Sequence, residues 1–211
     1  MHHLLLRMTL TTSTPLHTTG NRWTWSVDRA LPRLGDGLLR IPATTLKGLL
    51  RSNAEAVLRS WGHMVCLGPE PGKLCQPDCL CLVCQVFGNP SRPAALRFGD
   101  AIAGANYQVN IRSGVGISRS RKAAMPKLLF FTETASPNKW LATAEGIFSS
   151  AEAACQAAAL VAMAASTVPT VGASSSRGLG WLDEWQVEAV LDKVPVQPKT
   201  LQDHWRAWAG G

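Results

Sequence analysis

Apolar residues recur at spacings of three and four between residues 44 and 60, which predicts an amphipathic helix. The repeat consists of Leu46, Leu49, Leu50, Ala54, Val57 and Leu58. Pro42 and the pair Thr44 and Thr45 stand at its start, where we expect them to interrupt the preceding chain and cap the helix. A second helix is expected over residues 149–166, because alanine dominates there and no breaker interrupts the segment.

Alternating or continuous apolar runs predict strands at residues 4–12, 95–101, 127–133 and 181–190. A polar, tryptophan-containing loop follows the first strand, and a Gly/Ser loop at 172–180 precedes the last. Without its insertions the order is strand, helix, strand, strand, helix, strand, which is the ferredoxin-like, RRM-like α+β order. We therefore predict one domain over residues 1–211, with a tail at 192–211 whose Trp205 and Trp208 pack a short helix on the body or on a neighbouring subunit.

Composition narrows the classes of protein that fit this pattern. The chain has 211 residues, 46% hydrophobic and 17% charged, enough to bury a full core as one domain. Its formal charge of +7 and pI near 9.4 favour an acidic partner, with nucleic acid ahead of an anionic membrane. No apolar run approaches the roughly 18–20 residues of a membrane span, and the N-terminal segment is too short for a signal peptide. We expect a cytoplasmic protein, and no nucleotide-binding fingerprint or catalytic triad indicates a metabolic enzyme.

Five of the six cysteines lie between residues 66 and 84, which favours a metal site over a disulfide framework. Thiolates that are close in sequence and flanked by proline and glycine suit tetrahedral zinc, which needs four ligands. The best set is Cys66, Cys75, Cys81 and Cys84, in a zinc knuckle over residues 63–88. Cys79 is a possible substitute and His63 an outside candidate, while buried thiols or a redox pair are the alternative. Cys155 is expected to be a small core residue.

The first turns of the helix expected over residues 44–60 combine hydroxyl groups with positive charge. They contain Thr44, Thr45, Lys47, Gly48 and Arg51. Unpaired amides and the helix dipole add to the attraction for an anion such as phosphate. The alternative is an ordinary capped core helix with both cations in solvent.

Two further segments suit a sugar-phosphate backbone. A long basic segment is expected at residues 107–125. Residues 92–127 contain a single acid, Asp100, and seven cations: Arg92, Arg97, Arg112, Arg119, Arg121, Lys122 and Lys127. Such an arm would track phosphates with a salt-dependent affinity. The loop ASSSRGLG at 173–180 offers amides, hydroxyls and an arginine to a closely approaching ligand. A solvated hairpin and a plain connector are the alternatives.

Several short motifs occur in the order found in one protein family. They are L-H-x-x-G at 16–20, I-P-x-T-x-L-K-G at 41–48, C-x-x-C-Q-V-F-G at 81–88, RFGDA at 97–101, GISRSRKAAMPKLLFFTE at 116–133 and S-S-R-G-L-G at 175–180. Together they cover most of residues 5–185. In these features the chain resembles the RAMP superfamily of CRISPR effector proteins, and specifically the Cas-seven group of backbone subunits in type III or type III-derived complexes.

The resemblance implies a role in antiviral defence within a ribonucleoprotein complex. Such subunits stack with copies or paralogues of themselves, and with other CRISPR effector subunits, along a guide RNA. A thumb-like hairpin, here an insertion at residues 105–126, wedges between the guide and the complementary target RNA. The residues that would contact RNA are His17, Lys47, Arg51, Arg112, Arg119, Arg121, Lys122, Ser176 and Arg177.

Active members of this group cut target RNA with an aspartate just upstream of the I-P-x-x-x-L-K-G block, and Asp28 falls at that place. A carboxylate there can hold Mg²⁺ or another divalent cation that orients the ribose 2′-hydroxyl and neutralises developing charge. Asp36 is the nearest rival, but its flanking glycines suit a turn. Asp28 could instead be a loop carboxylate paired with Arg29 or Arg33.

Two other functions are compatible with the sequence. The chain could bind guide RNA as a structural or capping subunit while a partner carries the nuclease. It could also be a free-standing zinc-containing nucleic-acid-binding module unrelated to CRISPR. Replacement of Asp28 distinguishes cleavage from scaffolding, and a preference for guide RNA separates both from the third.

Overall fold

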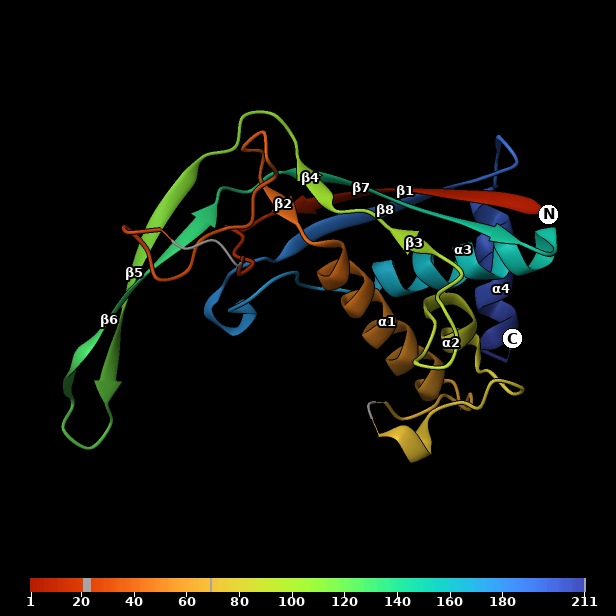
Figure 1. Cartoon of the computed structure of the whole chain (residues 1–211), viewed down its shortest axis with the longest axis horizontal. Coiled ribbons are helices and arrows are strands. Elements are labelled where there is room, and N and C mark those ends of the chain that lie inside the picture. The colour runs from red at the N-terminus through yellow and green to blue at the C-terminus, as the bar shows by residue number, and fades with distance from the viewer. Residues whose placement is uncertain (21–23, 69, 211) are drawn as a thin grey trace.

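The protein consists of one antiparallel sheet, a helical layer and a separate two-stranded hairpin (Figure 1). The computed structural model describes residues 1–20, 24–68 and 70–210. Residues 21–23, 69 and 211 fall in the predicted polar loop, zinc knuckle and tail, and lie outside the described residues. The elements are β1 (His2–Thr12), β2 (Arg40–Ile41), α1 (Ala43–Ser60), the 3₁₀ helix η1 (Pro71–Lys73), α2 (Leu82–Phe87), β3 (Arg97–Phe98), β4 (Ala101–Ala103), β5 (Val109–Ser118), β6 (Ala123–Ala135), β7 (Lys139–Phe148), α3 (Ala151–Ser166), the 3₁₀ helix η2 (Ser175–Arg177), β8 (Leu182–Leu191), β9 (Val194–Pro195) and α4 (Pro198–Trp208).

Strand β1 lies at the centre of the main sheet, hydrogen-bonded to β7 on one side and β8 on the other. The strand order is β2-β4-β7-β1-β8-β9, with β3 also paired to β7, and these pairings are antiparallel. Leu4, Leu6, Met8 and Leu10 of β1 are buried, whereas the residues between them are not. Because side chains alternate along a strand, one face of the sheet builds the core and the other faces solvent.

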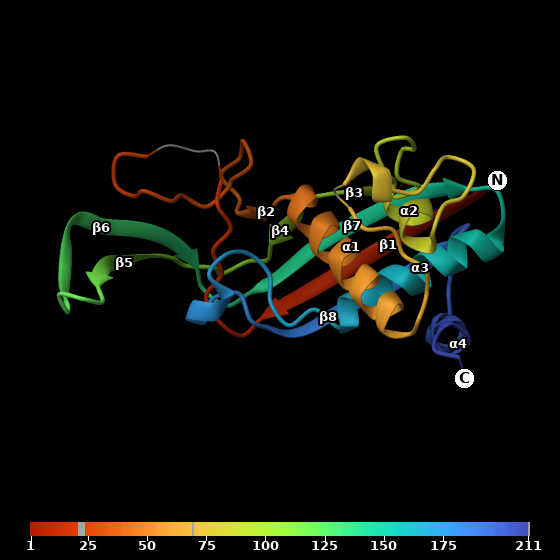
Figure 2. The same ribbon diagram turned by 90° about the horizontal axis from the view of Figure 1, so that it is seen from below.

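Helices α1 and α3 cover the buried face of the sheet (Figures 1 and 2). Their bounds confirm the two predicted helices. Helix α1 buries Leu46, Leu50, Ala54 and Leu58, a stripe at a spacing of four, and the alanine-rich α3 packs closely beside it. The C-terminal helix α4 packs on α3, where the Trp205 indole Nε1 donates to the Ala159 carbonyl at 2.8 Å. None of the described helices is long and apolar enough to cross a membrane.

Strands β5 and β6 form a hairpin that projects away from the body (Figures 1 and 2). The strand predicted at 127–133 lies within β6, so its assignment to the central sheet is wrong. Strand β7 takes that position, and the middle of its buried side holds the small residues Ala142 and Ala144, which give a weak periodic signal. The hairpin runs to Ala135, nine residues past the predicted thumb end at 126 (135 − 126).

The N-terminus of α1 is capped by a residue from elsewhere in the chain. Pro42 occupies the cap position without a side-chain hydrogen bond, and the threonine pair predicted to cap the helix lies within it. The Asp100 carboxylate accepts from the Ala43 N–H at 2.7 Å and pairs with Arg40 at 2.6 Å. A negative charge is favourable at a helix N-terminus, so the anion at this end is the protein's own carboxylate.

Candidate functional site

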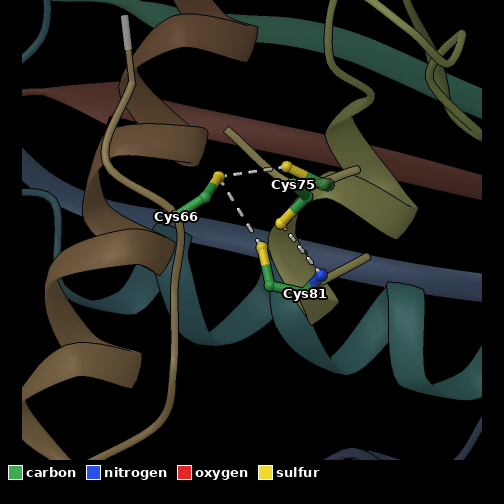
Figure 3. A group of neighbouring side chains, drawn as sticks. Cys66, Cys75 and Cys81 are labelled. Carbon is green, nitrogen blue, oxygen red and sulfur yellow. Dashed lines mark hydrogen bonds between the residues drawn. The ribbon is translucent and has the colours of Figure 1, made fainter. Parts of the chain in front are cut away.

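Four cysteines converge in the segment after α1, and their Sγ atoms all lie within 4.8 Å of one another. Cys66 and Cys75 come from loops, Cys81 is the cap residue of α2, and Cys84 lies in its first turn. Figure 3 shows Cys66, Cys75 and Cys81 turned toward a common centre. The Sγ of Cys66 lies 3.3 Å from that of Cys84 and 3.9 Å from that of Cys81. Four thiolates bound tetrahedrally to zinc at about 2.3 Å stand about 3.8 Å apart, so this set fits a zinc ion.

The alternative ligands lie elsewhere. Among the described residues, these four cysteines form the only group of histidine, cysteine and acidic side chains close enough to share a metal. Cys79 is exposed and outside the group. His63 donates from Nε2 to the Trp208 carbonyl at 2.7 Å, and Cys155 lies in α3. The structure therefore brings together the ligand set that the sequence favoured.

The thiols of the cluster differ in how readily they ionise. Burial raises the pKa of the Cys84 and Cys75 thiols. Burial also opposes ionisation of Cys81, but hydrogen bonds from the backbone of Cys66 and Cys84 and from the thiols of Cys75 and Cys84 together lower the pKa of the Cys81 thiol. Because a metal binds thiolates, loading of this cluster releases protons and becomes tighter as pH rises.

A second candidate site lies at the base of the hairpin, around a pocket of about 180 Å³. Three arginines from separate parts of the chain line it: Arg29 from the loop before α1, Arg112 from β5 and Arg177 from η2. Within the described residues, none of the three forms an ion pair with a carboxylate. Ser174 adds a hydroxyl, and the Arg29 guanidinium lies 5.8 Å from the centre of the Phe130 ring. Uncompensated guanidinium groups around a small pocket favour a phosphate.

Two loops distant in sequence assemble this pocket. The His17 carbonyl accepts from the Ala173 N–H at 2.8 Å, and the Pro15 carbonyl accepts from the Gly180 N–H at 2.9 Å. Gly172 and Gly180 have φ of +88° and +69°, and a Cβ at either would collide with a backbone carbonyl. Only glycine combines a positive φ with the absence of a Cβ. The two loops can therefore come close enough to place Arg177 beside the hairpin.

His17 is part of this scaffold, because its side chain is fully buried. Its Nδ1 lies 2.7 Å from the Glu133 carbonyl, which can only accept, so Nδ1 carries the proton. Its Nε2 lies 3.1 Å from the Thr19 hydroxyl. The RNA contact predicted for His17 is not available to a ring in the interior. His17 instead ties the first loop to β6, which carries the hairpin.

Protein stability is expected to fall below pH 6.5 because of His17. Burial lowers the pKa of His17 from its ordinary value of about 6.5, the nearby Arg29 adds to this, and the Glu133 carbonyl opposes it. The unfolded chain then binds a proton that the folded chain does not. Stability is therefore lost as pH falls from about 6.5 toward the folded-state pKa, by at most about 1.4 kcal/mol per pH unit. Urea unfolding at pH 7.5 and 5.5 measures the loss, which should be smaller in His17→Gln; an equal loss in that variant would assign it to other groups.

Asp28 is exposed and lies where the hairpin meets the body. Its Oδ2 accepts from the Phe131 N–H at 2.7 Å, and its own N–H donates to the Phe131 carbonyl at 2.9 Å. No described side chain forms an ion pair with Asp28, since Arg33 instead lies 3.9 Å from Glu133. Asp36 accepts from the Leu38 N–H at 3.0 Å, as in a turn. Asp28 thus presents a carboxylate beside Arg29, held by β6.

The two cations of α1 differ in their surroundings. Arg51 donates to Glu55, to the Gly88 carbonyl and to Cys84, so its guanidinium is engaged within the protein. Lys47 is half-buried, and burial with the neighbouring Arg51 lowers the pKa of its ammonium group. Lys47 lines a shallow pocket together with Arg51 and Arg92. Three cations therefore line this pocket, and the Arg51 guanidinium is the one already hydrogen-bonded to Glu55 and Gly88.

The hairpin itself has a basic tip and an apolar face. Arg119, Arg121 and Lys122 lie in the turn between β5 and β6 and are exposed, as are Arg112 and Ser176. The register pairs Val115 with Leu129 and Ser113 with Phe131, so these four side chains lie on the same face of the hairpin. The exposed apolar residues of that face are Ile111, Val115, Ile117, Leu129 and Phe131.

Sequence reasoning found Arg112 and Arg177 but missed Arg29, which it treated only as a partner for Asp28. The signal was its position beside Asp28, but nothing in the sequence placed it near the other two arginines.

Comparison with known proteins adds to this geometry. The family model described as the RAMP superfamily matches residues 9–183, which include both candidate sites. A search of the curated proteins finds no match.

Proposed function

The chain belongs to the RAMP superfamily of CRISPR-associated, RNA-binding proteins, and on this premise we propose that it is a Cas-seven-type backbone subunit of a type III or type III-derived effector complex. The observation that carries the proposal is the pocket at the hairpin base, where Arg29, Arg112 and Arg177 meet without an acidic partner among the described residues. A chain of phosphates supplies the anionic partner that these groups lack.

A ferredoxin-like core is part of this proposal. Support comes from the order β1, α1, β4, β7, α3, β8 along the chain, with β4, β7, β1 and β8 side by side in the sheet. Both helices cover one face, as in RNA-recognition modules. The cysteine knuckle and the hairpin are then insertions between elements of this core.

The hairpin of β5 and β6 is the proposed thumb. Its basic tip suits the RNA backbone, and its exposed apolar face suits contact with nucleobases between guide and target RNA. Ser176 and Arg177 at the pocket and Lys47 on α1 are the proposed contacts to the guide. Copies or paralogues of the chain and other effector subunits are the proposed partners.

We further propose that Asp28 takes part in cleavage of the target RNA. Its Oδ1 has no described partner, while Oδ2 is held by the Phe131 N–H, so the carboxylate is oriented and has one oxygen available. Mg²⁺ or another divalent cation held by Asp28 and the RNA phosphates would neutralise charge at the scissile phosphate. A lone carboxylate is a weak cation site, so cleavage should require bound RNA. A guide-binding subunit without nuclease activity is the second candidate, because no other described acidic group joins Asp28 in a metal cluster.

The arginine pocket is tested by RNA affinity. Replacing Arg29, Arg112 or Arg177 singly with glutamine is expected to weaken binding of guide RNA about tenfold, since a charge-assisted hydrogen bond contributes about 1.5–3 kcal/mol. Each change should also lower the salt dependence of log K by about one. Fluorescence anisotropy over a salt series measures both quantities.

Arg206→Gln is the matched control, because Arg206 is exposed on α4 at the opposite end of the molecule and pairs with Asp203. Its affinity should stay within about twofold of the wild-type value. If the three pocket variants bind RNA as the control does, the pocket is not an RNA site and the proposal fails.

A further inference from the structure

A cationic side chain outside the four cysteines contacts the cysteine cluster. Arg51, on the third turn of α1, directs its guanidinium at α2, the short helix that carries Cys84. One terminal nitrogen lies 3.8 Å from the Cys84 Sγ, and the other donates to the Gly88 carbonyl at 2.9 Å. Arg51 therefore contacts both a sulfur of the cluster and the carbonyl that follows α2.

This guanidinium is held in place from its own helix. Its Nε donates to the Glu55 carboxylate at 2.9 Å, one turn along α1, and its side chain is only 26% exposed. A planar guanidinium with five donors can meet three acceptors at once, which a lysine ammonium on a flexible stem cannot do in the same geometry. The contact to Cys84 is therefore built into the packing of α1 against α2.

The chemistry of the cluster explains why a cation belongs there. Four thiolates on one Zn²⁺ carry a net charge of −2, and Cys84 is completely buried. Buried negative charge is costly without a hydrogen-bond donor or an opposite charge, and donors to ligand sulfur hold the ligand and tune the metal site. The Arg51 guanidinium, 3.8 Å from the Cys84 Sγ, supplies both a donor and a positive charge, since arginine is always protonated in proteins.

We propose that Arg51 is a positioning residue of the metal site, donating to the Cys84 thiolate and offsetting the negative charge of a four-cysteine zinc centre. This assignment differs from the RNA contact that the family resemblance implied for Arg51. It depends on metal binding by the cysteines and not on RNA binding.

Helix α1 offers a matched control in Arg59. This residue pairs with the same Glu55 at 3.1 Å and donates to the Cys66 carbonyl at 3.0 Å, but has no contact with a sulfur among the described residues. Arg59→Gln removes a guanidinium from the same helix and the same carboxylate. It separates general support of the knuckle from the contact to the thiolate.

The test is zinc affinity of the full chain, measured by competition with a chromophoric chelator. Arg51→Gln is expected to weaken zinc binding about 10–100-fold, the usual effect of losing an outer partner of a metal ligand. Arg59→Gln should change the affinity by less than about fivefold. With Co²⁺ in place of zinc, Arg51→Gln should move the thiolate-to-metal charge-transfer band to lower energy, because the sulfur becomes more electron-rich, and Arg59→Gln should leave it in place.

If the glutamine variant does not fold, Arg51→Lys replaces it in the experiment. Its loss of zinc affinity should be intermediate, since lysine keeps the positive charge but lacks the planar set of guanidinium donors. Unchanged zinc affinity and an unchanged cobalt spectrum in the Arg51 variants would overturn the proposal. Equal losses in the Arg51 and Arg59 variants would also overturn it, as would wild-type protein that binds no zinc.

Discussion

Replacing Asp28 with asparagine is expected to lower guide-dependent cleavage of complementary RNA by at least about a hundredfold. The change removes the negative charge that would hold a divalent cation, and such a cation contributes several kcal/mol, with each 1.36 kcal/mol worth tenfold in rate. Asparagine keeps an oxygen that can accept from the Phe131 N–H, so the hairpin should stay in place. The measurement is single-turnover cutting of a labelled target by the full chain assembled on guide RNA with magnesium.

Asp36→Asn is the matched control, because that carboxylate belongs to a turn and accepts from the Leu38 N–H. It should cut at the wild-type rate, and both variants should bind guide RNA with wild-type affinity. An Asp28→Asn protein that cuts normally would remove Asp28 from the reaction. Wild-type protein that binds guide but never cuts would favour the scaffold subunit, with the nuclease in a partner.

Loss of the cluster metal is the second large effect that we expect. Chelation, or the Cys84→Ser change, should lower stability by at least about 4 kcal/mol, because the binding free energy of a structural metal is also folding free energy. For a chain of this size, that corresponds to a fall in the thermal midpoint of about 8–16 °C. Calorimetry with and without added zinc measures the fall, and the zinc content of the wild-type protein should be one per chain.

Cys79→Ser provides the control within the same segment, because Cys79 is exposed and outside the cluster. It should keep one zinc per chain and the wild-type midpoint. If it loses zinc, the ligand set differs from the observed group. If chelation leaves the midpoint unchanged, the four cysteines do not hold a structural metal.

Local sequence pattern could predict the two long helices, because their residues carry a regular apolar repeat or a strong helix propensity. Helix α1 followed from its leucine spacing and α3 from its alanines, and both were confirmed. Strand β7 was missed because small residues, Ala142 and Ala144, stand between Trp140 and Phe148 on its buried side and weaken the apolar alternation. The apolar run at 127–133 was mistaken for a core strand because the sequence cannot show that it pairs with β5 and with residues 28–29, outside the main sheet.

The residues of the candidate sites also differ in whether the sequence could predict their positions. The cluster of four cysteines could be predicted because they lie within 19 positions of one another (84 − 66 + 1), and local spacing restricts which atoms can share an ion. Asp100 as the cap of α1 could not be foreseen, because it is 57 residues from Ala43 and reaches it through the pairing of β2 with β4. The burial of His17 likewise depends on contacts with residues more than a hundred positions away.

The sequence by itself determined the two long helices, the basic character of the chain, the cluster of four cysteines and the motifs of its family, since these depend on residues near one another. Only the tertiary structure decided which cations share a pocket, because Arg29, Arg112 and Arg177 meet through loop and hairpin contacts that no local pattern encodes. It also decided that the Arg51 guanidinium contacts Glu55, Gly88 and Cys84. Whether a charge faces a ligand or a neighbouring side chain is set by packing between distant elements.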